Sequence, residues 1–143
     1  MEIIDSLIEK IESIVNEGKE LIDKARERAR EAKEYPNKLD SAFYLQVQDD
    51  LSEYYDLLLE KYLTVDAFYR DCEAIVTLAV KTKYEGEKKK PNADQLKAEI
   101  RNELTKISMA SNILDGWQKS VRNYIAGARA HINALTGKEY KSE

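Results

Sequence analysis

The sequence predicts an all-α protein in which a long antiparallel helical hairpin, resembling a coiled coil, follows an N-terminal amphipathic helix. Apolar residues recur every seven positions through two long stretches, a spacing typical of coiled-coil helices. Of the 143 residues, 35% are charged and only five are Gly and two Pro, a composition typical of long helices. Both prolines, Pro36 and Pro91, lie between the periodic stretches. We therefore expect residues 1–35 to form the first helix, residues 39–137 the hairpin and residues 138–143 a polar tail.

The first helix carries an apolar stripe on one face. Its members are Ile4, Leu7, Ile8, Ile11, Ile14, Val15, Leu21, Ile22, Ala25 and Ala29. Gly18 falls on the same stripe, where it costs about 1 kcal/mol relative to Ala. It either allows a neighbouring helix to approach closely or marks a bend. The helix is expected to end near Tyr35, because a residue before Pro is forced out of the helical region.

Charged and small residues alternate at the end of this first helix, over residues 24–33. One interpretation is a solvent-facing helix surface with paired charges. The other is a strip of cations that contacts phosphates. The pattern favours the first interpretation and leaves the second open.

The second helix is expected over residues 41–85, with Asp40 or Ser41 as its N-cap. Its seam consists of Tyr44, Leu51, Leu58, Val65, Cys72 and Ala79, with half-steps at Val47, Tyr54, Lys61, Phe68, Ile75 and Thr82. At a rise of about 1.5 Å per residue, such a helix is about 67 Å long. A helix of this length cannot be the centre of a small globule. We therefore expect its stripe to be buried on partner helices and the protein to form a homo-oligomer.

Gly86 is placed to end the second helix, and Pro91 prevents its resumption. Asn92 or Asp94 is then expected to cap a third helix that closes at Gly137. The third seam consists of Ala93, Ile100, Ile107, Leu114, Val121, Ala128 and Leu135, with half-steps at Leu96, Glu103, Ala110, Trp117, Tyr124 and His131. The residues selected as core or oligomer seam are Leu51, Leu58, Val65, Phe68, Ile100, Ile107, Leu114, Trp117 and Val121.

Charge is unevenly distributed along the chain. Residues 40–66 contain seven acidic residues and a single basic one, Lys61. Residues 81–106 contain eight Lys or Arg and five acidic residues. The net charge of -4 argues against a generally basic nucleic-acid binder, but a polyanion responds to the local charge. Five tyrosines lie in or just after the acidic stretch, at Tyr44, Tyr54, Tyr55, Tyr62 and Tyr69. Helical spacing predicts that they belong to a core or an interface; base stacking is the alternative, which the nearby acids oppose.

Catalytic and metal-binding patterns are not found in the sequence. The single Cys72 and the single His131 lie at seam positions, where an inert thiol and a hydrogen-bonded histidine are expected. No Gly-rich phosphate loop or Glu-x-x-His pair occurs. The apolar runs are far shorter than the roughly 20 residues that cross a bilayer. We therefore expect no enzyme activity, no cofactor, no metal and no contact with a membrane. We also expect a cytoplasmic location.

A Tyr-rich helix over residues 43–69 is followed by a segment with Lys81, Lys83 and Tyr84-Glu-Gly86, then by a basic turn, and then by a long helix containing Leu114, Trp117 and Gly127-Ala-Arg. Over roughly residues 40–135 this order resembles the UvsY-type recombination mediators of T-even and related phages. In that family a Lys-x-Arg pair near a helix end, before a Tyr-x-Gly, is implicated in binding single-stranded DNA. Lys81 and Lys83 stand at the matching positions, with Lys83 in place of the Arg.

The resemblance implies a homo-oligomer that binds single-stranded DNA, loosens the single-strand-binding protein and loads a RecA-type recombinase. It also implies the cytoplasm of a bacterial host if the protein is phage-encoded. The first 35 residues form a longer helix than the family usually shows there, and the resemblance implies nothing for them. The candidate DNA-binding residues are Lys81, Lys83, Lys88, Lys89, Lys90, Lys97 and Arg101. The alternative is a helical interaction or scaffold protein of a phage, which acts through protein contacts and in which Lys88, Lys89 and Lys90 are merely solvated.

Overall fold

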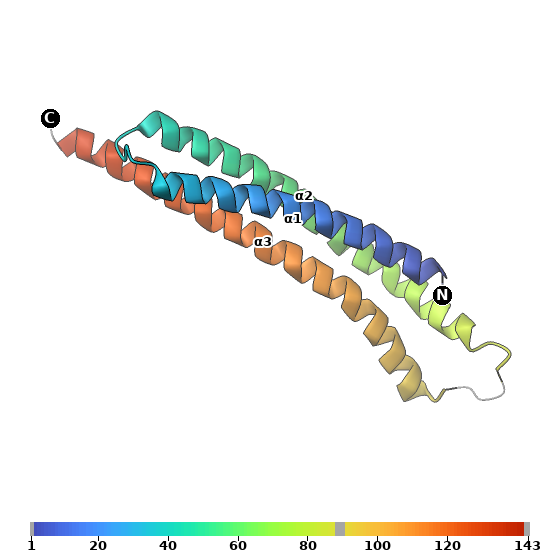
Figure 1. Ribbon diagram of the computed structural model, residues 1–143. Coiled ribbons are helices and arrows are strands. Elements are labelled where there is room, and N and C mark those ends of the chain that lie inside the picture. Colours follow the sequence, from blue (N-terminus) through green and yellow to red (C-terminus); the bar gives the residue numbers. More distant parts are fainter. Residues whose placement is uncertain (1, 88–90, 142–143) are drawn as a thin grey trace. The chain divides into compact units, whose positions relative to one another are not determined.

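The computed structural model describes residues 2–87 and 91–141, with the side chains of residues 3–87 and 91–137, and the all-α prediction is confirmed (Figure 1). The described residues form helices α1 (Glu2–Glu34), α2 (Ser41–Lys83) and α3 (Ala93–Lys141) and no strand. Residues 84–92 connect α2 to α3 in the chain. No described helix combines the length and the apolar character needed to cross a bilayer.

Polar side chains fix the starts of α2 and α3. The backbone N–H of Phe43 donates to Asp40 Oδ1 at 3.1 Å, so Asp40, rather than Ser41, caps α2. Asn92 caps α3 by accepting the N–H of Gln95 at 2.8 Å, while Gln95 Oε1 accepts the N–H of Asn92 at 3.2 Å. This reciprocal pair is a capping box. After α2, Gly86 adopts a φ of 82°, which an L side chain rarely allows.

The predicted end of the third helix at Gly137 is wrong, because α3 continues to Lys141. Gly stops a helix when it takes a left-handed conformation, and Gly86 alone does so among the described glycines. Gly137 instead keeps helical geometry at a modest entropic cost. The last two residues of the predicted polar tail, 142 and 143, lie outside the described residues.

The chain forms two compact units, and each contains a segment of all three helices. Unit 1 comprises Met1–Glu17 and Lys61–Leu114, and unit 2 comprises Gly18–Glu60 and Asp115–Glu143. The core of unit 2 is made of Ile22, Ala25, Val47, Leu51, Leu58, Val121, Ile125 and Ala128. Tyr54, Tyr55, Trp117 and Tyr124 are half-buried against this core.

The core of unit 1 includes Ile4, Ile11, Val65, Cys72, Val76, Val80, Leu104, Ile107, Ala110 and Leu114. The predicted seam fails after Cys72, because Val76 and Val80 are fully buried while Ile75 is 39% and Leu78 67% exposed. Val76 lies four residues after Cys72 and eleven residues after Val65. An eleven-residue spacing corresponds to three helical turns and matches 3.6 residues per turn better than a strict seven-residue repeat does. We call Ile75 and Leu78 the apolar ridge.

Most of the predicted seam is buried within a single chain. Leu51, Leu58, Val65, Ile107, Leu114 and Val121 are at most 1% exposed, and Phe68, Ile100 and Trp117 are half-buried. The three helix segments of each unit cover one another's stripes. A second copy is therefore not needed to cover this seam, and the expectation that partner helices bury it is wrong.

The burial of Leu58 predicts a large effect on stability. Leu58 is fully buried, whereas its neighbour Leu57 is 39% exposed. We expect Leu58→Ala to lower the free energy of unfolding by about 2–5 kcal/mol, since it removes buried methyl groups and leaves a cavity. Urea titration followed by circular dichroism measures this change. Leu57→Ala is the matched control, and equal losses in the two variants would contradict the packing described here.

Candidate nucleic-acid interface

Lys81 and Lys83 occupy the last turn of α2 in unit 1, and both are exposed. Cations are favoured there, because the carbonyl end of a helix carries partial negative charge. Lys81 has no ion-pair partner among the described residues. The remaining lysines of the predicted basic turn, Lys88, Lys89 and Lys90, lie outside the described residues.

Lys83 is bound by a carboxylate of its own chain. Its ammonium lies 2.7 Å from Glu99 Oε1 on α3, and the hydroxyl of Tyr84 donates to Glu99 Oε2. The hydrogen bond from Lys83, followed by that from Tyr84, lowers the pKa of Glu99 below its usual value. The same bond to Glu99 raises the pKa of Lys83. A phosphate that binds Lys83 must therefore compete with Glu99.

Lys97 and Arg101 lie beside an aromatic ring. Together with Tyr69 on α2 they line a surface hollow of about 320 Å³ in unit 1. Both cations are exposed and have no ion-pair partner among the described residues. Proteins that bind single-stranded nucleic acids combine cations, which contact phosphates, with aromatic rings, which stack on bases. The half-exposed ring of Tyr69 and its two neighbouring cations match this combination. This hollow, together with Lys81 and Lys83, is called the basic corner.

Unit 2 contains a larger and more basic hollow, of about 610 Å³, between its α1 and α3 segments. Its cationic lining residues are Arg26, Arg30, Lys33 and Lys38, and none of the described residues that line it is acidic. We call it the basic groove. In a chain of net charge -4, such a concentration of positive charge creates a local potential that attracts anions.

Small residues keep the basic groove open. Ala29 and Ala32 line it from α1, and Gly127 and Ala128 line it from α3. A Cβ atom built at Gly127 would meet nothing within 4 Å, so there is free space above this backbone. The floor consists of Tyr44, Val47 and Leu51 of α2, which are at most 4% exposed. The groove is thus apolar at the bottom and positively charged at the rim.

Aromatic rings lie at one end of the basic groove. Tyr44 and His131 have ring centroids 4.0 Å apart, and the Tyr44 hydroxyl donates to the carbonyl of Ala32 at 3.3 Å. His131 Nε2 lies 2.7 Å from the carbonyl oxygen of Lys38, which can only accept, so Nε2 carries the hydrogen. Tyr124 on α3, which is half-buried, contributes a further ring to the lining.

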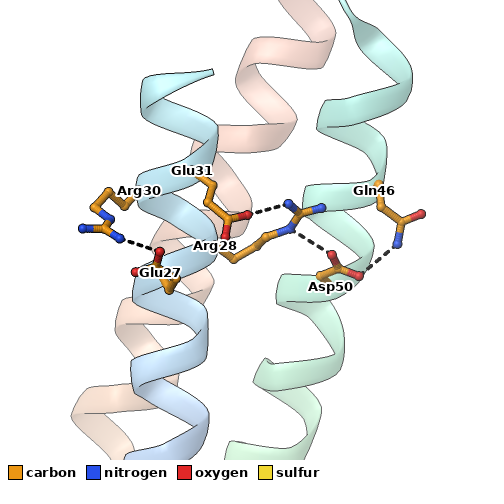
Figure 2. A network of polar contacts seen from close by, with 6 residues as sticks. All are labelled: Glu27, Arg28, Arg30, Glu31, Gln46 and Asp50. Atoms are coloured by element: carbon orange, nitrogen blue, oxygen red, sulfur yellow. Dashed lines mark hydrogen bonds and ion pairs between the residues drawn. The ribbon is translucent and has the colours of Figure 1, made fainter. Parts of the chain in front are cut away.

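Figure 2 shows how the charged end of α1 is held in unit 2. Arg28 reaches α2 and donates to Asp50 at 2.9 Å, and Gln46 donates to the other oxygen of Asp50. Arg30 lies on the other side of α1 and pairs with Glu27. The pairs of Arg30 with Glu27 and of Arg26 with Asp23 are exposed, and such pairs contribute only about 0–1 kcal/mol.

The sequence predicted DNA contacts at Lys81, Lys83, Lys97 and Arg101, which lie in the basic corner, and left the strip over residues 24–33 as an alternative. The structure places Arg26, Arg30 and Lys33 of that strip on the basic groove. Their spacing of four and three residues puts them on one helix face, and this spacing was the available signal. Nothing in the sequence indicated that Tyr124 and Gly127, almost a hundred residues later, form the opposite wall.

The described residues contain no group of His, Cys, Asp and Glu that could hold a metal ion. Cys72 is fully buried, and its burial, followed by the negative charge of Asp71, raises the pKa of the thiol. Comparisons with protein families, curated proteins and solved structures find no significant match to this chain. The resemblance to UvsY-type mediators therefore depends on the sequence features alone.

The pair of Lys83 with Glu99 predicts a pH-dependent contribution to stability. The pKa of Glu99 is lowered on folding, so the contribution is complete above its unfolded pKa of about 4.3 and is lost as pH falls through the lower folded pKa. Glu99→Gln should lower the melting temperature slightly at pH 7 and by less at about pH 3. Glu73→Gln, at an exposed acid of α2, is the control and should have little effect at either pH. A difference for Glu99→Gln that is as large in acid as at pH 7 would contradict the assignment.

Proposed function

We propose that the protein is a non-enzymatic recombination mediator that binds single-stranded DNA as a homo-oligomer and helps to load a RecA-type recombinase. The single observation that carries the DNA-binding part is the basic groove, which combines four cationic side chains with aromatic rings and no acidic lining residue in the described part of the chain. The recombinase and the single-strand-binding protein follow from the family resemblance. This role belongs in the cytoplasm of a bacterial host.

The basic groove suits an extended phosphodiester chain. Arg26, Arg30 and Lys33 follow one another along α1, where they can contact successive phosphates. Bases can then turn toward Tyr124 and the apolar floor, because every base has an apolar face that stacks without regard to sequence. The exposed ion pairs of Arg26 and Arg30 are weak enough to be exchanged for phosphates.

The basic corner supplies a second set of cations. Lys81, Lys97 and Arg101 are exposed and unpaired among the described residues, whereas Lys83 is held by Glu99. One chain neutralises only a few phosphates by these contacts. Self-association would join several grooves and corners on one strand, and linked weak contacts raise the overall affinity strongly.

Removing two cations of the basic groove should weaken DNA binding in a salt-dependent way. Each phosphate contact with a single strand adds about 0.7 to the slope of log affinity against log salt. We expect Arg30→Ala with Lys33→Ala to reduce this slope by about 1.4, measured by fluorescence anisotropy with a labelled oligothymidylate. Lys24→Ala with Arg129→Ala is the matched control, because both cations are exposed in unit 2 but neither lines the groove.

The wild-type chain must bind the oligonucleotide for the proposal to stand. Micromolar protein that leaves it free at about 50 mM salt would rule out the mediator function. If the groove variant and its control show equal slopes, the protein still binds DNA, but the basic groove is not the DNA-binding site.

Releasing Lys83 should strengthen binding if the basic corner contacts DNA. Glu99→Gln removes the carboxylate that competes for the Lys83 ammonium, while the amide oxygen can still accept from Tyr84. We expect a higher affinity and a steeper salt dependence than in the wild type, measured by the same anisotropy titration. Lys83→Ala in the Glu99→Gln background should remove the gain. An unchanged affinity in Glu99→Gln would place Lys83 outside the interface.

The second candidate function is that of a helical interaction or scaffold protein. It is favoured by an apolar groove of about 320 Å³ between the α1 and α3 segments of unit 1. Seven apolar residues line this apolar groove: Ile8, Ile11, Val15, Ile107, Met109, Ala110 and Ile113. Under this function the cations only keep the surface hydrated, and the oligonucleotide titration separates the two candidates.

A further inference from the structure

Unit 1 carries two apolar surface features that its own chain leaves exposed. The apolar ridge on α2 presents Leu78 at 67% and Ile75 at 39% exposure. The apolar groove between α1 and α3 presents Met109 at 57% and Ile113 at 42% exposure. Exposed leucines scattered singly are normal, but an apolar ridge and an apolar groove within one unit indicate an interaction.

The apolar ridge cannot occupy the groove of its own chain. α2 packs in unit 1 through Cys72, Val76 and Val80, which are fully buried. At 100° per residue, Leu78 points away from that face and Ile75 lies at its edge. A groove that receives the ridge must therefore belong to another molecule.

We propose that the apolar ridge of one copy of this chain inserts into the apolar groove of a second copy. Ile75 and Leu78 lie three residues apart on one helix face, with the small Ala74 beside them, so they can enter a groove as adjacent anchors. Ile8 and Val15 on α1 are half-buried, and Met109 and Ile113 rise on the other side.

Charges at the edges of the two surfaces are complementary. Glu12 of α1 and Lys106 of α3 lie on opposite walls of the apolar groove. The ridge is bordered by Arg70, which is 81% exposed in its side chain, and by Asp71. Arg70 also pairs with Asp66 at 3.6 Å, an exposed pair that it can exchange for Glu12. Asp71 can then face Lys106, whose ammonium keeps donors free beyond its bond to Glu103. Opposite signs at the rim set orientation and partner choice.

The ridge and the groove are different surfaces, so the contact is heterologous. Each copy offers one of each, and association continues until a ring closes or a filament grows. The inference rests on the self-association in the proposed function and names its interface. It requires no DNA, so its failure is separate from a failure of DNA binding.

The test is the molar mass in solution, measured by light scattering after size exclusion without DNA. Wild type should exceed the mass of one chain, whereas Leu78→Glu on the ridge and Met109→Glu in the groove should each reduce it to one chain. An equimolar mixture of the two variants should form a species of two chains and no larger one. The intact ridge of the Met109→Glu chain then meets the intact groove of the Leu78→Glu chain.

Leu63→Glu is the matched control, because Leu63 is a 54% exposed leucine on α2 in the same unit but outside both surfaces. It should retain the wild-type mass. Glu12→Lys should lower the mass, and Arg70→Glu added to it should restore assembly. If Leu78→Glu loses helicity by circular dichroism, Leu78→Gln and Ile75→Gln take its place. The proposal is overturned if the wild type has the mass of one chain, or if the mixture of the two variants stays as single chains. An equal loss of mass in Leu63→Glu would overturn it as well.

Discussion

The burial of the apolar stripe of α2 by the α1 and α3 segments is the interaction on which the other features depend. Leu51, Leu58 and Val65 are at most 1% exposed, and full burial of such a side chain contributes about 1.5–3 kcal/mol. Surface ion pairs such as Arg30 with Glu27 contribute much less. The stripe therefore determines which helix faces point outward and which side chains meet at the ends of the helices. The basic corner and the basic groove are both consequences of that placement.

Local rules in the sequence predict the helices and their caps well. Asp40 and Asn92 cap their helices because short polar side chains satisfy the first free backbone N–H groups, and this requires only neighbouring residues. The heptad also predicts the burial of Leu51, Leu58 and Val65. It fails after Cys72, since a helix with 3.6 residues per turn drifts from a strict seven-residue repeat unless it is supercoiled. The seam then follows Val76 and Val80.

The candidate interface is less accessible to sequence reasoning because it joins distant segments. The contact between Lys83 and Glu99 depends on the relative position of two helices across a turn, which no local rule specifies. The cations of the basic groove could be placed on one face of α1 from their spacing. That His131 and Tyr124 of α3 line the same hollow follows only from the packing in unit 2. Self-association was expected from the seam, yet the exposed apolar surface lies elsewhere, on the ridge and the apolar groove.

The burial of Cys72 makes its thiol a reporter of local unfolding. The thiolate is the reactive form of cysteine, and both complete burial and a raised pKa suppress it in the folded chain. Alkylation therefore requires α2 to separate from its neighbours in unit 1. Cys72 is the only cysteine in the sequence, so unit 2 adds nothing to the signal. The rate of modification thus reports every opening that exposes unit 1, from local separation of its helices up to global unfolding.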